Sequence, residues 1–469
     1  MLKKLFVLFV VLFATPVFAA NWYVRPNGGS YSSEDGSDWT NAYDGFSDIA
    51  WGSVSCGDTI WVAGGTYTQN LTIAKNCSSG SQLYIRRARA DSTDCTEATG
   101  WDAGYASTVH QVNTGIRNNG DYDYVTVSGR TTASGGTHGW YIDYTGSTGG
   151  SGVAYGNGAD VDYNTIEYVD IQGPGYIEYT TDGRGLDITP GYSVLSGHNT
   201  YSHLKVWDWE SGIYCGWSEY EIFEYIEVYG LRAVNWASYH PNMFYLHDAN
   251  YITIRYGNFH GALGEGIFFT NNDTNIDGAY IYGNVFHSFS GSTQKAIQPD
   301  NTGTTNDIQV YNNTFDYTYL TFYGDGIAGA TNSNTKNNIF SRCQSGCGSI
   351  GTTSDNLSTS TDVFVDRSGA DYHIVATISG GYPRDAGATL TSTYNTDPDG
   401  NTRGADGTWD IGAYEYDSGG DTTDPVVTIT DSDPKAVSSS STTLTGTASD
   451  ANGIDECKWR SGSAPDESN

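Results

Sequence analysis

Basic side chains are scarce in this sequence, which has 22 Lys and Arg against 54 Asp and Glu and a formal net charge of −32. Nucleic acid is therefore not an expected partner, because phosphate binding needs clustered Lys and Arg. The same imbalance disfavours long-range attraction of an acidic glycan, unless bound cations such as Ca²⁺ or a local basic surface intervene. The 36 Tyr and 59 Gly, in contrast, are typical of strands and tight turns.

Long apolar runs are missing beyond the first residues of the chain. Residues 1–20 read MLKKLFVLFVVLFATPVFAA, with two lysines, an apolar run and a small-residue end. This is the pattern of a signal peptide cleaved after Ala19 or Ala20, and the run is too short to span a membrane. We expect the mature chain to be secreted or held at the cell surface, without membrane insertion, and to be a monomer.

Two short motifs alternate between residues 171 and 340, and each recurs about every 28 residues. The first is a strand that ends in a bulky apolar residue, at Ile171, Val206, Val228, Phe259, Phe286, Phe315 and Phe340. The second is a short side chain followed by an apolar one, at Leu186, Ile213, Met243, Ile267, Ile297 and Ile327. A strand-only repeat of this length predicts a β-helix, whose stacked coils bury a continuous core. The asparagines of YGNF, YGNVF, YNNTF and KNNIF are expected to stack inside the turns and to exchange side-chain hydrogen bonds.

Stacking places residues at equal offsets about 4.8 Å apart in neighbouring coils. The residues that follow the apolar residues of the first motif form one column, namely Trp207, Tyr229, His260, His287 and Asp316. Strand alternation places this column on the outer surface. Our hypothesis gives Trp207, Tyr229 and Asp316 a role in substrate binding, and His260 and His287 a catalytic role. The alternative is that the histidines are turn residues that donate to backbone carbonyls, and a one-residue slip between Phe259 and Phe286 would dissolve the column.

A second column stands two residues before the apolar residues of the second motif, at Arg184, Ser211, Pro241, Glu265, Lys295 and Asp325, and Glu210 and His240 lie one position earlier. Glu265 and Asp325 are expected two coils and about 9.6 Å apart, near the upper limit for the carboxyl groups of an inverting glycoside hydrolase. A polysaccharide lyase needs a base and a cation instead, for which Lys295, His240, His260 and His287 are candidates. The structural alternative is an exposed ladder of attracting charges at Glu265, Lys295 and Asp325.

The segment from Asn21 to Tyr84 contains NWYVRPNGGS, GSDWTNAYDGF and SCGDTIWVAGGTYTQNLTI. These motifs resemble the opening turns of secreted right-handed parallel β-helix proteins of the pectin-lyase-like superfamily, which include lyases and hydrolases. The tail PDGNTRGADGTWDIGAYEY, ending at Tyr416, resembles the closing segment of exported β-helix proteins. The resemblance implies a β-helix domain over residues 21–416 with a C-terminal cap. Neither the Asp-Asp and Arg-Ile-Lys motifs of polygalacturonase-like hydrolases nor the Arg-x-Pro-x-x-Arg of pectate lyases is found, so no catalytic residue is carried over.

Residues 417–424, DSGGDTTD, have the composition of a polar linker. The strands in PVVTITDSDP, TTLTGTASD and IDECKWR then resemble the start of a bacterial immunoglobulin-like module, so residues 425–469 are expected to form an incomplete sandwich. The seven cysteines of an exported chain predict disulfides. We expect Cys343 to pair with Cys347 and two of Cys56, Cys77 and Cys95 to pair, leaving Cys215 as a buried thiol and Cys457 as the odd cysteine.

The sequence thus predicts an all-β fold, a right-handed parallel β-helix followed by a partial immunoglobulin-like sandwich. Its predicted function is to bind an extracellular or cell-wall polysaccharide and to cleave it as a hydrolase or a lyase. The alternative is a non-catalytic adhesin or structural protein of the cell surface. No spacing of Cys and His predicts a zinc site, and Ca²⁺ is the ion that acidic side chains on the turns would suit.

Overall fold

The computed structural model describes residues 19–147, 149–175, 183–190, 196–231, 241–261, 264–270, 276–289, 295–299, 305–318, 320–322, 331–343, 351–375, 383–416, 426–429 and 446–449. The chain divides into two compact units, Met1–Tyr416 and Asp417–Asn469. In the second unit the described residues form the antiparallel pair β37 (Val426–Ile429) and β38 (Gly446–Ser449). Most of the expected signal peptide lies outside the described residues. No helix in the described part of the chain is long and apolar enough to cross a membrane.

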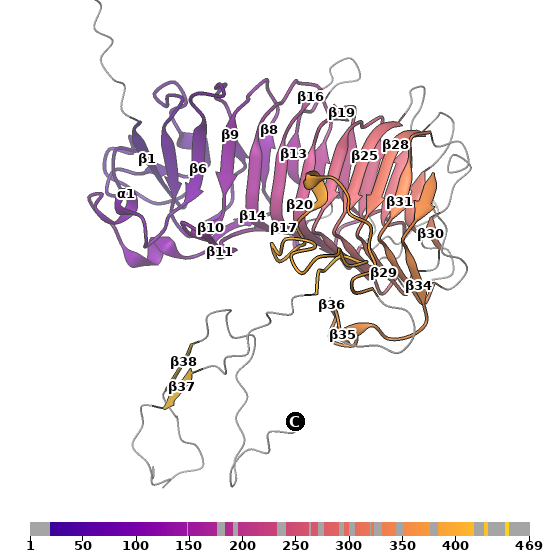
Figure 1. Cartoon of the computed structure of the whole chain (residues 1–469). Coiled ribbons are helices and arrows are strands. Elements are labelled where there is room, and N and C mark those ends of the chain that lie inside the picture. The colour runs from indigo at the N-terminus through magenta and orange to yellow at the C-terminus, as the bar shows by residue number, and fades with distance from the viewer. Residues whose placement is uncertain are drawn as a thin grey trace, which may run out of the picture. The chain divides into compact units, whose positions relative to one another are not determined.

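Parallel strands of the first unit stack coil upon coil, which confirms the predicted parallel β-helix (Figure 1). A 21-stranded sheet bends along its length into two faces, and a nine-stranded sheet forms the third. Face 1 contains β1 (Asn21–Arg25), β3 (Thr59–Val62), β6 (Leu83–Arg87), β9 (Val125–Ser128), β22 (Ile252–Arg255), β25 (Ile276–Tyr282), β28 (Thr305–Tyr311), β31 (Asn334–Lys336) and β33 (Thr352–Ser354). Face 2 contains β4 (Gly65–Tyr67), β7 (Val109–Val112), β12 (Trp140–Asp143), β23 (Asn258–His260), β26 (Val285–His287), β29 (Thr314–Asp316), β32 (Ile339–Ser341) and β34 (Leu357–Thr359).

Three strands of eight residues run through both of these faces, and they are β14 (Thr165–Gln172), β17 (Thr200–Trp207) and β20 (Ile222–Tyr229). Face 3 contains β5 (Leu71–Thr72), β8 (Ile116–Asn118), β13 (Ser151–Tyr155), β15 (Arg184–Ile188), β18 (Ser211–Gly216), β21 (Phe244–His247), β24 (Ile267–Thr270), β27 (Lys295–Pro299) and β30 (Leu320–Phe322). The short strand β2 (Tyr43–Asp44) also belongs to the 21-stranded sheet, where it pairs with the end of β1. Outside the faces lie the pair β16 (Ser196–Gly197) and β19 (Ser218–Glu219), and the hairpins β10 (Arg130–Thr132)–β11 (Gly135–His138) and β35 (Phe364–Asp366)–β36 (Asp371–Ile374). The helical turns are η1 (Phe46–Asp48), α1 (Thr93–Thr96), η2 (Ala103–Ala106) and η4 (Ser392–Tyr394).

The first apolar ladder has the predicted register. Its seven residues pair successively from Ile171 through Phe340, and all are buried in the core. Burial of one such side chain is worth about 1.5–3 kcal/mol. Because each coil continues the apolar surface of the previous one, this ladder holds the stack together.

The second ladder differs from the prediction at two places. Ile213 pairs with Phe244 instead of Met243, and Ile297 pairs with Phe322 instead of Ile327. Met243 and Phe244 are both fully buried, so an apolar pattern alone does not choose between them. The corrected register places Asn242, rather than Pro241, beside Glu265, and it pairs Lys295 with Leu320 instead of Asp325.

From β14 onward, the corner between faces 1 and 2 has one left-handed residue in each coil, with positive φ at Tyr168, His203, Tyr225, Tyr256, Gly283, Asn312, Asn337 and Asp355. In the last coils the next residue is an asparagine, which is fully buried at Asn284, Asn313 and Asn338 and half-buried at Asn356. These asparagines form the predicted ladder. Nδ2 of Asn284 donates to Oδ1 of Asn313, Nδ2 of Asn313 donates to Oδ1 of Asn338, and Nδ2 of Asn338 donates to Oδ1 of Asn356, each over 3.0 Å. Asn258 is outside this ladder, because it lies on face 2 and accepts from His287.

The corner between faces 3 and 1 is lined by an aromatic corner stack, which we define as Tyr124, Tyr163, His198, Tyr220 and Tyr251. All five residues have positive φ, and successive ring centroids are 4.7–4.8 Å apart. Tyr163 and Tyr220 remain 42% and 43% exposed. Beneath this stack, the fully buried Glu221 accepts from Ser218 Oγ and from the backbone and side-chain N–H groups of Asn199.

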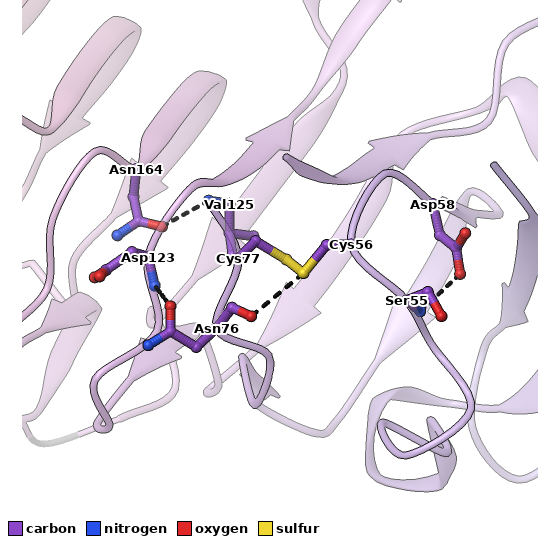
Figure 2. The surroundings of a disulfide bond; sticks show 8 residues. All are labelled: Ser55, Cys56, Asp58, Asn76, Cys77, Asp123, Val125 and Asn164. Atoms are coloured by element: carbon purple, nitrogen blue, oxygen red, sulfur yellow. Dashed lines mark hydrogen bonds between the residues drawn. A yellow bond between two sulfur atoms is a disulfide. The ribbon is translucent and has the colours of Figure 1, made fainter. Parts of the chain in front are cut away.

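A disulfide fastens the first coils. Cys56 pairs with Cys77 at a Cα–Cα distance of 5.5 Å, and Asn76 beside it binds Asp123 of the coil that contains β9 (Figure 2). Cys95 and Cys215 are buried free thiols, as expected for Cys215. Cys343 is also disulfide-bonded, and its expected partner Cys347 lies outside the described residues.

Residues 383–416 pack back along the corner between faces 1 and 2. Thr396 hydrogen-bonds Tyr256 at 2.8 Å, the Asp410 carbonyl accepts from Asn312, and the Ala388 carbonyl accepts from Asn337. The hairpin β35–β36 lies over the last strands of face 2, where Tyr372 contacts His287 and Asp316 (Figure 1). The C-terminal part of the first unit thus covers several coils at once.

Candidate functional site

The outward column of face 2 has the predicted register. Trp207 pairs with Tyr229, Tyr229 with His260, His260 with His287, and His287 with Asp316. These residues alternate with the inward ladder, so the strands themselves hold the side chains on the outer side. The column is open to solvent over Trp207, Tyr229 and His260, whose side chains are partly exposed.

The rings of this column stack face to face. Trp207 lies parallel to Tyr229 within 6°, Tyr229 to His260 within 5°, and His260 to His287 within 15°, with centroids 4.8–5.9 Å apart. A sugar ring that stacks on an aromatic side chain needs a free face, and these faces cover one another. Trp207 and Tyr229 therefore present ring edges and polar tips, which suit hydrogen bonding to hydroxyl groups.

Glu227 binds His260 and Lys205 in the middle of this open surface. Its Oε1 lies 3.0 Å from Nε2 of His260, and its Oε2 lies 2.9 Å from Nζ of Lys205. Burial raises the pKa of Glu227, but the hydrogen bonds from His260 and Lys205 outweigh it and lower this pKa to about 2. The carboxylate is then ionised at neutral pH, so Nε2 of His260 carries the hydrogen. Within the described part of the chain, Nδ1 of His260 has no hydrogen-bond partner, and it is the nitrogen that can accept a proton.

His287 and Asp316 do not lie on the open surface. They are 5% and 1% exposed, because the Tyr372 ring of β36 packs at a tilt of 44° against the His287 ring and its hydroxyl lies 3.2 Å from Asp316. Arg342 donates two hydrogen bonds to the Asp316 carboxylate, at 3.1 and 2.7 Å. Burial lowers the pKa of His287 to about 4, so the imidazole is neutral.

The second predicted column lies at the start of the face 3 strands, across the turns from the first column. Nζ of Lys295 is 3.9 Å from Oε1 of Glu265, and it donates to Gln298 at 2.8 Å. Both Glu265 and Lys295 are largely buried. His240 and Asp325 lie outside the described residues, and the corrected register no longer places Asp325 beside Lys295.

Sequence reasoning missed Glu227 and Lys205, which belong to a neighbouring column. Lys205 pairs with Glu227 and Glu227 with Asn258, two residues along the strand from Trp207, Tyr229 and His260. A residue two positions away on a strand has the same outward orientation. Reading this second outward column would have found the contact between Glu227 and His260.

No group of three or more His, Cys, Asp or Glu side chains that could hold a metal ion occurs among the described residues. The expected Ca²⁺ therefore has no preformed site of this kind there. The acidic residues nearest the open surface are bound to histidines, as Asp143 is to His110 at 3.1 Å and Asp170 is to His138 at 2.6 Å.

The described strands and faces define the class of the protein, which is a parallel β-helix protein. No protein-family model and no curated protein matches the chain. Among solved structures, it is similar to pectate lyase Pel9A, with 16% identity, a TM-score of 0.50, and coverage of 86% of this chain and 97% of that chain. It is also similar to XylC solved with xylose (10% identity, TM-score 0.38, covering 72% and 76%) and to the PL6 family alginate lyase AlyGC (13%, 0.38, 72% and 51%). At 16% identity the likeness to the pectate lyase shows the fold alone.

Proposed function

We propose that this protein is an exported enzyme that binds a polysaccharide over the open part of face 2 and cleaves it by elimination. The observation that carries the proposal is the contact between Glu227 and His260. It fixes one imidazole nitrogen as a donor and leaves the other free to act as a base. The fold shared with the pectate lyase supports the substrate class, and the free nitrogen supports the chemistry.

In the proposed reaction, Nδ1 of His260 removes the proton next to the carboxyl group of a uronic acid unit. The electron pair of that C–H bond forms a carbon–carbon double bond, and the bond to the glycosidic oxygen breaks. The leaving oxygen takes a proton from solvent. Glu227 stabilises the imidazolium that forms, and Lys205 places positive charge near the substrate carboxylate. A bridging Ca²⁺ would offset the repulsion between an acidic glycan and this acidic protein.

Hydrolysis by two carboxyl groups has less support. The predicted pair of Glu265 and Asp325 depended on a register in which Lys295 lies between them, and Lys295 pairs with Leu320 instead. Glu227 cannot serve as the acid, because its pKa of about 2 leaves it ionised at neutral pH. Lys295 remains the second candidate base, and its contact with Glu265 would have to open first.

The test is product release from a panel of acidic and neutral polysaccharides, with Ca²⁺ or a chelator, followed by the absorbance of unsaturated sugars. We expect unsaturated products and a loss of about 10²–10⁴-fold in kcat for His260→Ala. Glu227→Gln should lower kcat, because the neutral amide stabilises the imidazolium of His260 less than the carboxylate does. His198→Ala, in the aromatic corner stack, is the matched control and should leave the rate unchanged.

Other outcomes would overturn specific parts of the proposal. Saturated products would indicate a hydrolase. Loss of activity in Lys295→Ala but not in His260→Ala would identify Lys295 on face 3 as the base. If a folded sample cleaves no member of the panel, the protein is better explained as a non-catalytic adhesin.

A further inference from the structure

The open surface of face 2 ends abruptly one coil beyond His260. His260 keeps 24% of its side chain exposed, whereas His287 in the next coil is 5% exposed and Asp316 in the coil after it is 1% exposed. The covering group is the hairpin β35–β36, whose Tyr372 ring centroid is 4.9 Å from that of His287. A glycan that lies along the column must therefore stop or leave the face at this point.

The hairpin is fastened to the coils that it covers. Arg367, in the turn of the hairpin, donates to Ser341 Oγ at 2.9 Å and lies 3.5 Å from the Asp316 carboxylate. His373 binds Asp371 of the hairpin at 2.6 Å and Asp399 of the C-terminal segment at 2.7 Å. Because the hairpin is bound on the coil side and on the segment side, it is a fixed wall.

The surface is asymmetric around the proposed base. From His260 to the wall there is one coil step of about 4.8 Å, which leaves room for little more than one sugar unit. In the other direction the column continues over Tyr229, Trp207, Gln172 and Asp143, which is four coil steps or about 19 Å. Polar groups line this longer side, including the Gln172 and Asp143 side chains, so several sugar units can bind there.

We infer that the protein acts on the ends of polysaccharide chains. It holds the long part of the chain over β12, β14, β17 and β20 of face 2 and places the terminal unit against Tyr372. This inference rests on the proposed function, since it takes His260 as the point of cleavage. It names the substrate class more narrowly, as acidic polysaccharides with a free chain terminus. The products are single unsaturated sugars or very short oligosaccharides.

The experiment follows wild-type protein on a long acidic polysaccharide that it cleaves, and compares product size with viscosity. We expect short products from the first time points while viscosity falls slowly. The same polymer capped at both ends with a bulky fluorophore should be cleaved at least 10-fold more slowly. Early products of random length, or an unchanged rate on the capped polymer, would overturn the inference.

A pair of variants tests the wall itself. Tyr372→Ala removes the ring that covers His287, and we expect its early products to be longer than those of wild type. Tyr414→Ala is the matched control, because Tyr414 packs on the far side of the hairpin against His373. Identical product sizes in a folded Tyr372→Ala would also count against the inference.

The inference and the proposed function fail in distinguishable ways. Random cleavage that His260→Ala abolishes refutes the end preference alone, whereas cleavage that His260→Ala leaves intact refutes the site.

Discussion

Replacing Asn313 by alanine should destabilise the β-helix more than any replacement of a half-buried polar residue on its surface. Asn313 is fully buried, and its Oδ1 accepts from both the backbone and the side-chain N–H groups of Asn284, each at 3.0 Å. Its Nδ2 donates to the carbonyls of Ile281 and Tyr311 and to Asn338. One side chain thus joins three successive coils.

The expected loss follows from these contacts. The variant leaves the backbone N–H of Asn284 buried without its acceptor, which costs about 1–3 kcal/mol, and each remaining hydrogen bond is worth a net of about 0.5–1.5 kcal/mol. The free energy of unfolding should therefore fall by about 3–9 kcal/mol. At neutral pH, Asn313→Asp should lower the free energy of unfolding at least as much as Asn313→Ala does, because it places a charged carboxylate oxygen where Nδ2 faces three oxygens. Acid should protonate this carboxylate and restore part of the stability.

The measurement is urea unfolding followed by far-UV circular dichroism, with Asn334→Ala as the matched control. Asn334 lies on face 1, is half-buried, and donates to Gln309 at 2.9 Å. Its replacement should cost less than about 1 kcal/mol. If the free energy of unfolding of Asn313→Ala lies within about 1 kcal/mol of that of Asn334→Ala, the asparagine ladder does not hold the coils together.

Three further predictions concern other buried or paired groups. Burial raises the pKa of Glu221 to about 8, so the folded protein holds this proton more tightly than the unfolded chain does. As the pH rises from about 4.3 to about 8, the unfolding temperature should therefore fall. Glu221→Gln should make the unfolding temperature less dependent on pH over this range. Hydrogen bonding to Asp399 raises the pKa of His373 to about 9. This contact should therefore stabilise the fold fully below about pH 6.5, and the stabilisation should be lost as the pH rises through 9. In thermal scans, His373→Gln should not show this loss. Replacing both cysteines, with Cys56→Ser and Cys77→Ser, opens the loop of 21 residues that the disulfide closes and should lower the free energy of unfolding by about 3 kcal/mol. Because reductant also opens the disulfide of Cys343, reductant should still destabilise the variant, but by about 3 kcal/mol less than it destabilises wild type.

The apolar ladders show how far sequence reasoning reaches in this fold. The first ladder was predictable in full, because each coil has one bulky apolar residue followed by a polar or aromatic one, from Val206-Trp207 to Phe315-Asp316. The predicted register of the second ladder was wrong where two apolar residues are adjacent, as at Met243-Phe244, and where the turn before the strand changes length. The catalytic pair of Glu265 and Asp325 stays a prediction, because Asp325 lies outside the described residues and the corrected register removes only its place beside Lys295.

The candidate site was predictable only in part for a different reason. The column containing Trp207, Tyr229 and His260 followed from strand alternation, but Glu227 contacts His260 diagonally across coils. The cover over His287 and Asp316 comes from Tyr372, which is more than fifty residues away in sequence from Asp316. No repeat within the coils encodes a contact made by a segment outside the repeat.

The aromatic corner stack gives this protein an optical property that follows from its coil spacing. His198 has no near-ultraviolet transition, so the rings that couple are two tyrosine pairs, Tyr124 with Tyr163 and Tyr220 with Tyr251, each with centroids 4.8 Å apart and planes 8° from parallel. The coupled transitions should give a strong near-ultraviolet circular dichroism band that neither isolated tyrosines nor the unfolded chain would show. Since the rings belong to successive coils, the band depends on the distance between coils. Its amplitude would therefore report the separation of the middle coils without any added label.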